Sequence, residues 1–224
     1  ISKCAVWSSD SSKIYVGVNS TNSNIYAAVV SLSLGSGTLT DLGAEYSFNT
    51  AGNTFVDINV NGNILYVLMN SQTYGFSIFA MTGATSGSSL TYSFNVTCNT
   101  LIPVDSYFGS NTKMIFGKIL FDSSSNVYTV TYAGKSTGNE ILLTKVSSAG
   151  VLSFFQSFGA MQTSSTTEMC PTGAAIGSDG NILISGYELV ATSGNGMYKG
   201  FVMSVTTTGA FNYGKTFAGS SCNV

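Results

Sequence analysis

The chain has 224 residues, of which only 8% are charged, and its formal net charge is −2. It contains no His, and all 8 basic residues are Lys. This composition excludes the basic footprint of a nucleic-acid-binding protein and the polybasic cluster of a protein that binds anionic membranes. No apolar run approaches the roughly 18 residues of a membrane-spanning helix, so we expect no membrane insertion.

Hydroxyl side chains take the place of charge, with 35 Ser and 25 Thr. A hydrophobic fraction of 44% and an aromatic fraction of 12% nevertheless predict a folded chain rather than a disordered one. A folded protein usually depends on surface charge to stay soluble. So little charge therefore indicates one of three situations, which are a glycosylated surface, a surface buried in an assembly, or a robust extracellular setting.

Strand-like segments recur along the chain with a regular spacing. They begin at Ile14 (IYVGVN), Ile64 (ILYVLM), Val127 (VYTVTY) and Ile182 (ILISGY), and each is followed by a turn glycine, Gly37, Gly87, Gly150 and Gly209 respectively. The glycine comes 23 residues after each of the first three anchors and 27 residues after the fourth, where ATSGNG is inserted. Internal repeats of about 50 residues are typical of propellers and repeat arrays.

The first copy covers residues 4–51 and the second residues 52–97. In the second copy, Asn61-Gly62 is predicted to form a two-residue hairpin turn, because such pairs tolerate positive φ angles. The segment ILYVLM that follows is apolar at successive positions. In an antiparallel sheet with one face exposed to solvent, apolar and polar residues should alternate along each strand. This segment does not alternate, so it predicts a sheet that is covered on both faces.

The third copy, residues 98–169, begins with an insertion, residues 98–113, and continues through ILLTKVSSAG and VLSFFQSFG. The fourth copy, residues 170–221, shows the unit most clearly. Its predicted strands are TGAAIGS, NILISGYE, KGFVMSVT and AFNYGKTF, with tight turns at Asp179-Gly180 and Thr208-Gly209. Four strands joined by short hairpins form one antiparallel meander.

Four-stranded sheets that are apolar on both faces stack against neighbours, and a ring of such sheets is a β-propeller. We therefore predict one all-β domain over residues 1–224, a propeller of four four-stranded antiparallel blades, or of more blades if the chain is a segment of a longer array. The strand NILISG (181–186) and the aromatic-rich segment 201–217 resemble the bacterial-type β-propeller repeat family. This resemblance implies a fold and not an activity.

The four cysteines are Cys4, Cys98, Cys170 and Cys222. The absence of CxxC pairs and of His argues against a zinc site, so we predict two disulfides in an oxidising compartment. In a closed ring of four repeats, Cys222 returns to the position of Cys4, which favours the pairs Cys4–Cys222 and Cys98–Cys170. The alternatives are four buried thiols, or a Cys222 that opens a fifth copy.

Two sequons, at Asn19 and Asn95, are predicted N-glycosylation sites and indicate an extracellular glycoprotein. The single Trp, Trp7, is a candidate glycan contact, although packing inside the first blade is the simpler interpretation. Asp10, Asp122 and Asp179 recur near the first hairpin of their copies, where we interpret them as turn caps. We predict no catalytic residue, no metal ligand and no cofactor.

These observations lead to a ranked set of functions. The first is a non-enzymatic, extracellular or cell-surface module with a structural or adhesive scaffold role, as the repeating subunit of a filament or surface layer. Its partners would be copies of itself or other extracellular proteins and glycans. The second is a carbohydrate-binding, lectin-like propeller. The third and least favoured is a glycoside hydrolase or lyase that depends on a pair of carboxylates.

Overall fold

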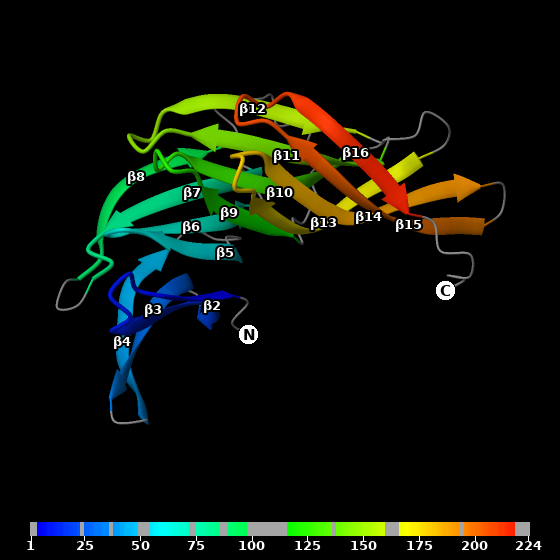
Figure 1. The fold of residues 1–224 in the computed structure, drawn as a ribbon. Helices are drawn as coiled ribbons and strands as arrows, with labels where there is room; N and C mark the ends of the chain where they lie inside the picture. The colour runs from blue at the N-terminus through cyan, green and yellow to red at the C-terminus, as the bar shows by residue number, and fades with distance from the viewer. Residues whose placement is uncertain are drawn as a thin grey trace. The chain divides into compact units, whose positions relative to one another are not determined.

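The computed structural model describes residues 4–22, 25–35, 38–48, 54–71, 75–85, 89–97, 116–135, 138–159, 166–192 and 195–217. Over these ranges the chain forms sixteen strands, β1 to β16. Within the same ranges there is no helix long and apolar enough to span a membrane. The chain divides into two compact units, residues 1–102 and 103–224. Within each four-stranded sheet, consecutive strands form antiparallel hairpins (Figure 1).

The first unit contains two sheets. The first sheet consists of β1 (Cys4–Trp7), β2 (Lys13–Asn22), β3 (Ile25–Gly35) and β4 (Thr38–Phe48). The second sheet consists of β5 (Thr54–Asn61), β6 (Ile64–Ser71), β7 (Gly75–Thr82) and β8 (Thr91–Thr97). In both, each strand pairs with its neighbour in sequence.

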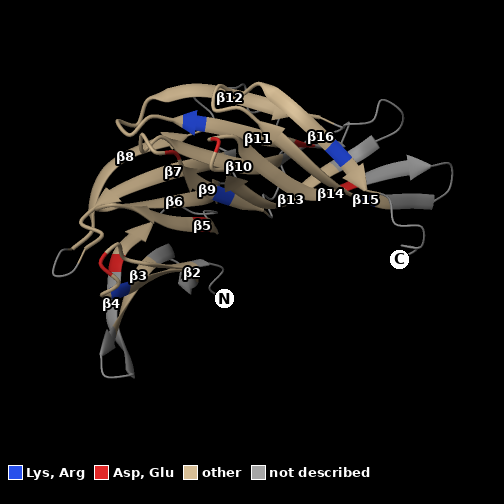
Figure 2. Cartoon of the chain, in the orientation of Figure 1, with Lys and Arg blue, Asp and Glu red and all other residues tan. Residues whose placement is uncertain are grey.

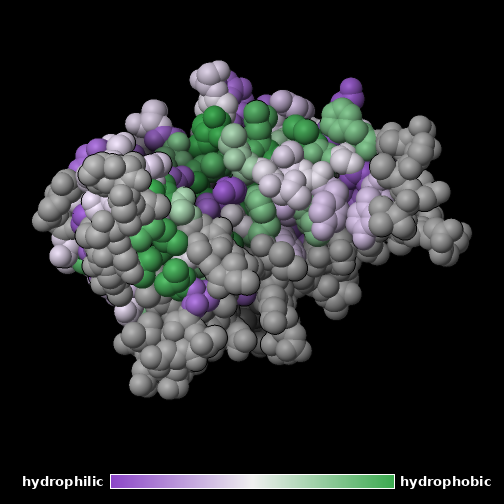
Figure 3. Space-filling view, turned by 90° about the horizontal axis from the view of Figure 1, so that it is seen from below, coloured by the Kyte–Doolittle hydropathy of each residue, from purple (hydrophilic) through white to green (hydrophobic). Residues whose placement is uncertain are grey.

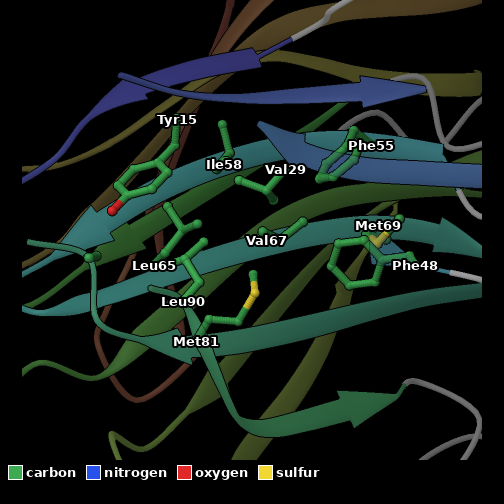
Figure 4. Packing of buried hydrophobic residues seen from close by; sticks show 11 residues of the cluster. Tyr15, Val29, Phe48, Phe55, Ile58, Leu65, Val67, Met69, Met81 and Leu90 are labelled. Atoms are coloured by element: carbon green, nitrogen blue, oxygen red, sulfur yellow. The ribbon is translucent and has the colours of Figure 1, made fainter. Parts of the chain in front are cut away.

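One face of the first sheet packs on one face of the second through an apolar core. Tyr15, Val29 and Phe48 of the first sheet meet Leu65 and Val67 of the second in this core, and all five are buried (Figure 4). Fully burying an apolar side chain of this size stabilises the fold by about 1.5–3 kcal/mol. The contact between the two sheets is therefore a major source of stability for this unit.

The second unit also contains two sheets. The third sheet consists of β9 (Gly117–Phe121), β10 (Val127–Lys135), β11 (Gly138–Val146) and β12 (Leu152–Phe158). The fourth consists of β13 (Thr166–Ile176), β14 (Ile182–Thr192), β15 (Asn195–Val205) and β16 (Phe211–Phe217). A single parallel pairing of Asn139 with Glu168 joins β11 to β13.

A second apolar core fills the space between the third and fourth sheets. Val130, Ile141 and Leu143 of the third sheet pack in one cluster with Ile184 and Met203 of the fourth. The prediction of an all-β chain made of four-stranded antiparallel sheets is confirmed. The predictions of one domain over residues 1–224 and of the repeat limits stay predictions, as do the disulfides that depend on a closed ring.

The predicted turns need correction in their details. Asn61 pairs with Ile64, so the two loop residues of the second copy are Gly62 and Asn63, with Gly62 at φ +57°. Ile176 pairs with Ile182, so five residues, not two, separate these strands around Asp179-Gly180. The shorter loop of the second copy shifts the strand that follows it by one residue relative to the fourth copy. The buried core position that Ile182 occupies in the fourth sheet is therefore occupied by Leu65, and not by Ile64, in the second sheet.

Charged residues are few and scattered over the described strands and turns, as Figure 2 shows. Figure 3 shows hydrophobic residues in several patches among hydrophilic ones. The surface therefore carries no broad field of one sign in the part of the chain that the structure describes, and a functional site must be found from local geometry.

Candidate functional site

A polar cavity of about 440 Å³ lies in the second unit, at the end of the sheets where the β9–β10, β13–β14 and β15–β16 turns meet. We call it the turn cavity. Its walls are Phe121, Asp122, Ser123, Ser124, Asn126, Lys145, Ile176, Gly177, Ser178, Gly180 and Thr207. Ligand sites in proteins are concave and usually of a few hundred cubic ångströms, and the turn cavity falls in that range.

Asp122 is the carboxylate in the wall of this cavity, and its turn holds it in place. Its Oδ1 accepts hydrogen bonds of 2.9 Å from the backbone N–H groups of Ser124 and Asn126. Its Oδ2 accepts hydrogen bonds from Asn126 Nδ2 at 2.8 Å and from the Tyr128 hydroxyl at 3.1 Å. Asp side chains close turns in this way because the carboxylate reaches backbone donors two residues on.

Lys145 and Tyr128 place further polar groups beside Asp122. Lys145 Nζ lies 4.0 Å from Asp122 Oδ2 and donates a 3.3 Å hydrogen bond to the carbonyl oxygen of Thr207. It also lies 5.1 Å from the centre of the Tyr128 ring. Lys145 and Tyr128 belong to the third sheet and Thr207 to a turn of the fourth, so the cavity depends on the packing of these two sheets.

The electrostatics of the turn cavity follow from these contacts. Burial acts to raise the pKa of Asp122, but hydrogen bonds from Asn126, Tyr128 and Ser124 outweigh it and hold that pKa below its ordinary value. Burial, with the hydrogen bond to Asp122, raises the pKa of Tyr128. At neutral pH the cavity therefore presents an anionic carboxylate beside a neutral phenol.

A second carboxylate, Asp179, belongs to the β13–β14 turn, which contributes wall residues to the cavity. Its Oδ1 accepts a 3.0 Å hydrogen bond from the backbone N–H of Asn181, and its Oδ2 accepts one of 2.7 Å from Asn181 Nδ2. These bonds lower the pKa of Asp179. The carboxylate lies over Gly177, where an added Cβ would be only 2.7 Å from Asp179 Oδ1. Gly177, Ser178 and Gly180 of the same turn are wall residues, whereas Asp179 itself is not one of them.

The interpretation of the three aspartates as turn caps is confirmed. In the first unit, Asp10 Oδ1 accepts a hydrogen bond of 3.1 Å from the backbone N–H of Ser12, as Asp122 and Asp179 do in their turns. The sequence did not indicate the cavity that surrounds Asp122. Lys145 and Thr207 are remote from Asp122 in sequence, and only sheet packing brings the three together.

A second group of acidic residues lies on three adjacent strands of the same unit. Glu140 is on β11, Glu168 on β13 and Glu188 on β14, and the register pairs Asn139 with Glu168 and Met169 with Glu188. Glu188 is completely buried, so a substrate does not reach it. The turn cavity is therefore the better candidate site.

No group of three or more Cys, Asp or Glu side chains is placed to hold a metal ion among the residues with described positions. The turn cavity is instead lined by hydroxyl, amide and carboxylate groups together with the ring of Phe121. Such a lining can accept and donate hydrogen bonds to several hydroxyl groups while the ring covers an apolar face.

The predicted disulfides stay predictions. Cys98 and Cys222 lie outside the described residues, and of Cys4 only the backbone in β1 is described. Cys170 is buried on β13, directly opposite Tyr187 of β14. A hydrogen bond between these two side chains, with burial, raises the pKa of Tyr187 to about 12.

The predicted glycan-related residues occupy different environments. Asn19 is half-buried and its Oδ1 accepts a 3.0 Å hydrogen bond from the backbone N–H of Phe55. Asn95 is exposed on β8, and its Oδ1 accepts a 2.7 Å hydrogen bond from the Tyr92 hydroxyl. Trp7 is 44% exposed on β1. Glycosylation of either Asn and a glycan contact at Trp7 stay predictions.

Neither a family model nor a curated relative matches this sequence, but solved structures match the fold. An endo-arabinase from Bacteroides thetaiotaomicron is 11% identical with a TM-score of 0.52, and the match covers 92% of this chain and 76% of that one. A putative 6-phosphogluconolactonase from Bacteroides uniformis is 13% identical with a TM-score of 0.59, covering 97% and 55%. An α-L-arabinofuranosidase from Clostridium thermocellum is 14% identical with a TM-score of 0.51, covering 96% and 71%.

These structures correct two expectations drawn from the sequence. We expected a protein that is not an enzyme, with a structural or adhesive role in a filament or surface layer, and the comparisons contradict both. All three similar proteins are named as enzymes, and two of them act on arabinose-containing glycans by name. The chain spans 55% to 76% of the length of these proteins.

Proposed function

We propose that the protein is a carbohydrate-active enzyme, a glycoside hydrolase, and that the turn cavity binds the sugar. The observation that carries this proposal is Asp122 in the wall of a hydroxyl-rich cavity of about 440 Å³, with Asp179 in the β13–β14 turn that lines the same cavity. Glycoside hydrolysis commonly uses two carboxyl groups that flank the scissile bond. The fold shared with an endo-arabinase and an arabinofuranosidase supports the same reaction class.

The side chains of the cavity suggest distinct roles. Asp122 is held ionised by its hydrogen bonds, which suits a nucleophile, a general base or a group that stabilises positive charge on the sugar ring. Lys145 and Asn126 are donors for sugar hydroxyls, and Phe121 offers an apolar surface for one face of the ring. Asp179 supplies the second carboxylate from the neighbouring turn.

We also propose that the four-stranded sheets are blades of a β-propeller. Within each unit, two four-stranded sheets pack face to face through an apolar core, which is the way that blades pack. The likeness to the three solved structures supports this arrangement.

The proposed activity is tested by release of reducing sugar from arabinan and from an aryl arabinofuranoside. We expect the protein to hydrolyse one of them, and we expect Asp122→Asn and Asp179→Asn to lower kcat by about 100-fold or more. The substitution to Asn keeps one oxygen, which can accept the hydrogen bonds from the backbone N–H groups of each turn, so we expect the fold to be retained. Thermal unfolding of each variant verifies this.

Asp10→Asn is the matched control, because Asp10 caps a comparable turn in the first unit. It should leave the rate unchanged. Glu140→Gln tests the competing group of glutamates. A protein with no hydrolytic activity on either substrate would refute the proposed enzyme, and a loss of activity in Glu140→Gln but not in Asp122→Asn would move the site to the other end of the sheets.

A further inference from the structure

The third sheet has a face that is covered by the fourth sheet, and we call it the forward face. One cross-strand row of this face consists of Tyr132, Ile141 and Phe158, which are paired in register. Tyr132 is 7% exposed and Ile141 is 0% exposed. Phe154 belongs to the same face, and both Phe154 and Phe158 pack against the core between the two sheets. The forward face of the third sheet is therefore a sheet-packing surface.

The fourth sheet carries a forward face with the same pattern. Tyr187 pairs with Gly200 and Gly200 with Phe217, in the positions of Tyr132, Ile141 and Phe158. Tyr213 stands in the position of Phe154, two residues after the first residue of the last strand. Here, however, the side chains are exposed: 39% for Tyr187, 53% for Tyr213 and 52% for Phe217.

The first sheet confirms that this position is normally covered. Its row of Asn19, Ala27 and Phe48 corresponds to the row of Tyr187, Gly200 and Phe217. Phe48 is 5% exposed, because it packs between the first and second sheets in contact with Phe79. The same aromatic position is therefore covered by another sheet in the first and third sheets and is uncovered in the fourth.

The face that does the covering also has a constant pattern, and we call it the rear face. In the fourth sheet the rear face consists of Ile176, Ile182, Ile184, Met203 and Val205, all of which pack on the third sheet. In the first sheet the register places Trp7, Ile14, Val16, Val30 and Leu32 in these five positions. None of these five belongs to the described core between the first and second sheets; Trp7 is 44% exposed and the other four side chains are half-buried.

The forward face of the fourth sheet and the rear face of the first sheet therefore match the two sides of a sheet-packing interface. We propose that the forward face of the fourth sheet binds the rear face of the first sheet of a second copy of this chain. Aromatic rings on one face and aliphatic side chains with Trp7 on the other are the composition that packs inside each unit. The central row of this forward face is more polar, with Ser185 and Lys215 beside Val202, which suits a reversible contact.

When each copy engages both of its faces, the exchange is reciprocal and the product is a closed dimer with two equal contacts. A four-stranded face about 19 Å wide and about 24 Å long covers about 450 Å², from the spacing of strands and residues. Two such contacts, counted on both partners, bury on the order of 1,800 Å². This area is that of a standard stable interface, so we expect a dimer at micromolar protein concentration.

Sedimentation velocity over a range of protein concentrations tests this proposal. The wild type should dimerise, and the double variant Tyr213→Ser/Phe217→Ser should raise the dimer dissociation constant by about tenfold or more. Trp7→Ser should do the same from the other face. Tyr92→Ser is the control, because Tyr92 is 45% exposed but lies on β8 of the second sheet and so belongs to neither face. All four side chains are exposed, so each variant should keep its fold by circular dichroism.

A mixing experiment tests which faces pair. In an equal mixture of Tyr213→Ser/Phe217→Ser with Trp7→Ser, a heterodimer has one contact with both mutated faces and one contact with two intact faces. The mixture should therefore dimerise more tightly than either variant alone. A wild type that stays monomeric, variants that dimerise as well as the wild type, or a mixture with no gain would each overturn the proposal.

Discussion

Replacing Asp122 by Ala should destabilise the second unit by about 2–3 kcal/mol. The side chain accepts four hydrogen bonds, and three of the donors belong to Ser124 and Asn126 in the turn, where water can replace the lost acceptor. At about 0.5 kcal/mol each, these three contribute about 1.5 kcal/mol. The fourth donor is the hydroxyl of Tyr128, which is fully buried and would keep only the longer hydrogen bond of 3.4 Å to the carbonyl oxygen of Thr207. Losing the Asp122 acceptor therefore costs about 1 kcal/mol more.

Urea unfolding at neutral pH measures this effect, with Asp122→Asn as the milder variant and Tyr128→Phe to complete a double-mutant cycle. We expect a coupling energy of about 1 kcal/mol between Asp122 and Tyr128, because they share one hydrogen bond. An Asp122→Ala variant within about 0.5 kcal/mol of the wild type, or a cycle without coupling, would refute this reasoning.

The same stabilisation should depend on pH. The pKa of Asp122 is lowered in the folded state, so its contribution is present above the unfolded pKa of about 4 and is lost as the pH falls through the folded value. The difference in stability between the wild type and Asp122→Ala should therefore shrink on acidification below about pH 4. A difference that persists in strong acid would contradict the assignment of the lowered pKa.

Two further substitutions test the backbone. Gly186→Ala should lower the free energy of unfolding by about 3 kcal/mol, because a Cβ there would overlap the carbonyl oxygen of Cys170 and lie 2.8 Å from Phe201 Cε1. Gly200→Ala is the control, because a Cβ at Gly200 would have no heavy atom nearer than 4.0 Å. It should change the free energy of unfolding by less than about 1 kcal/mol. Ser125→Gly should raise the thermal midpoint by stabilising the fold by about 0.5–1 kcal/mol, because Ser125 has a φ of +61° that costs an L residue about 1–2 kcal/mol. An unchanged or lower midpoint would show that the turn carries no such strain.

Much of the fold could be predicted from the residues because local signals agree with the packing. The run ILYVLM is apolar at successive positions, and residues 65 to 69 are indeed buried on both faces of β6. The aspartates of the first hairpins are turn caps, as their spacing indicated. The anchors of the second and fourth copies, Ile64 and Ile182, are not equivalent in the core, because a two-residue loop in the second copy replaces the five-residue turn that separates Ile176 from Ile182.

The candidate site could not be predicted in the same way. The sequence around Asp122 predicts a turn residue, and the hydrogen bonds of its side chain within the turn are consistent with this prediction. What makes it a candidate is the approach of Lys145 and Thr207, which come from another strand and another sheet. No local pattern specifies such a meeting, because it depends on how the third sheet stacks on the fourth. The uncovered aromatic face of the fourth sheet likewise emerges only from the strand register.

The order of strand pairing has a consequence for how this chain folds. Among the strands that the structure describes, each strand pairs with its neighbour in sequence within its sheet, and the short pairing of β11 with β13 is the one departure from that order. Loop closure between such strands costs little entropy, so the relative contact order is low for an all-β protein and folding should be fast for this class. Each sheet can form as soon as its own four strands have left the ribosome. The β3–β4 or β14–β15 hairpin can nucleate its sheet before the neighbouring sheet that packs on it has been synthesised or folded.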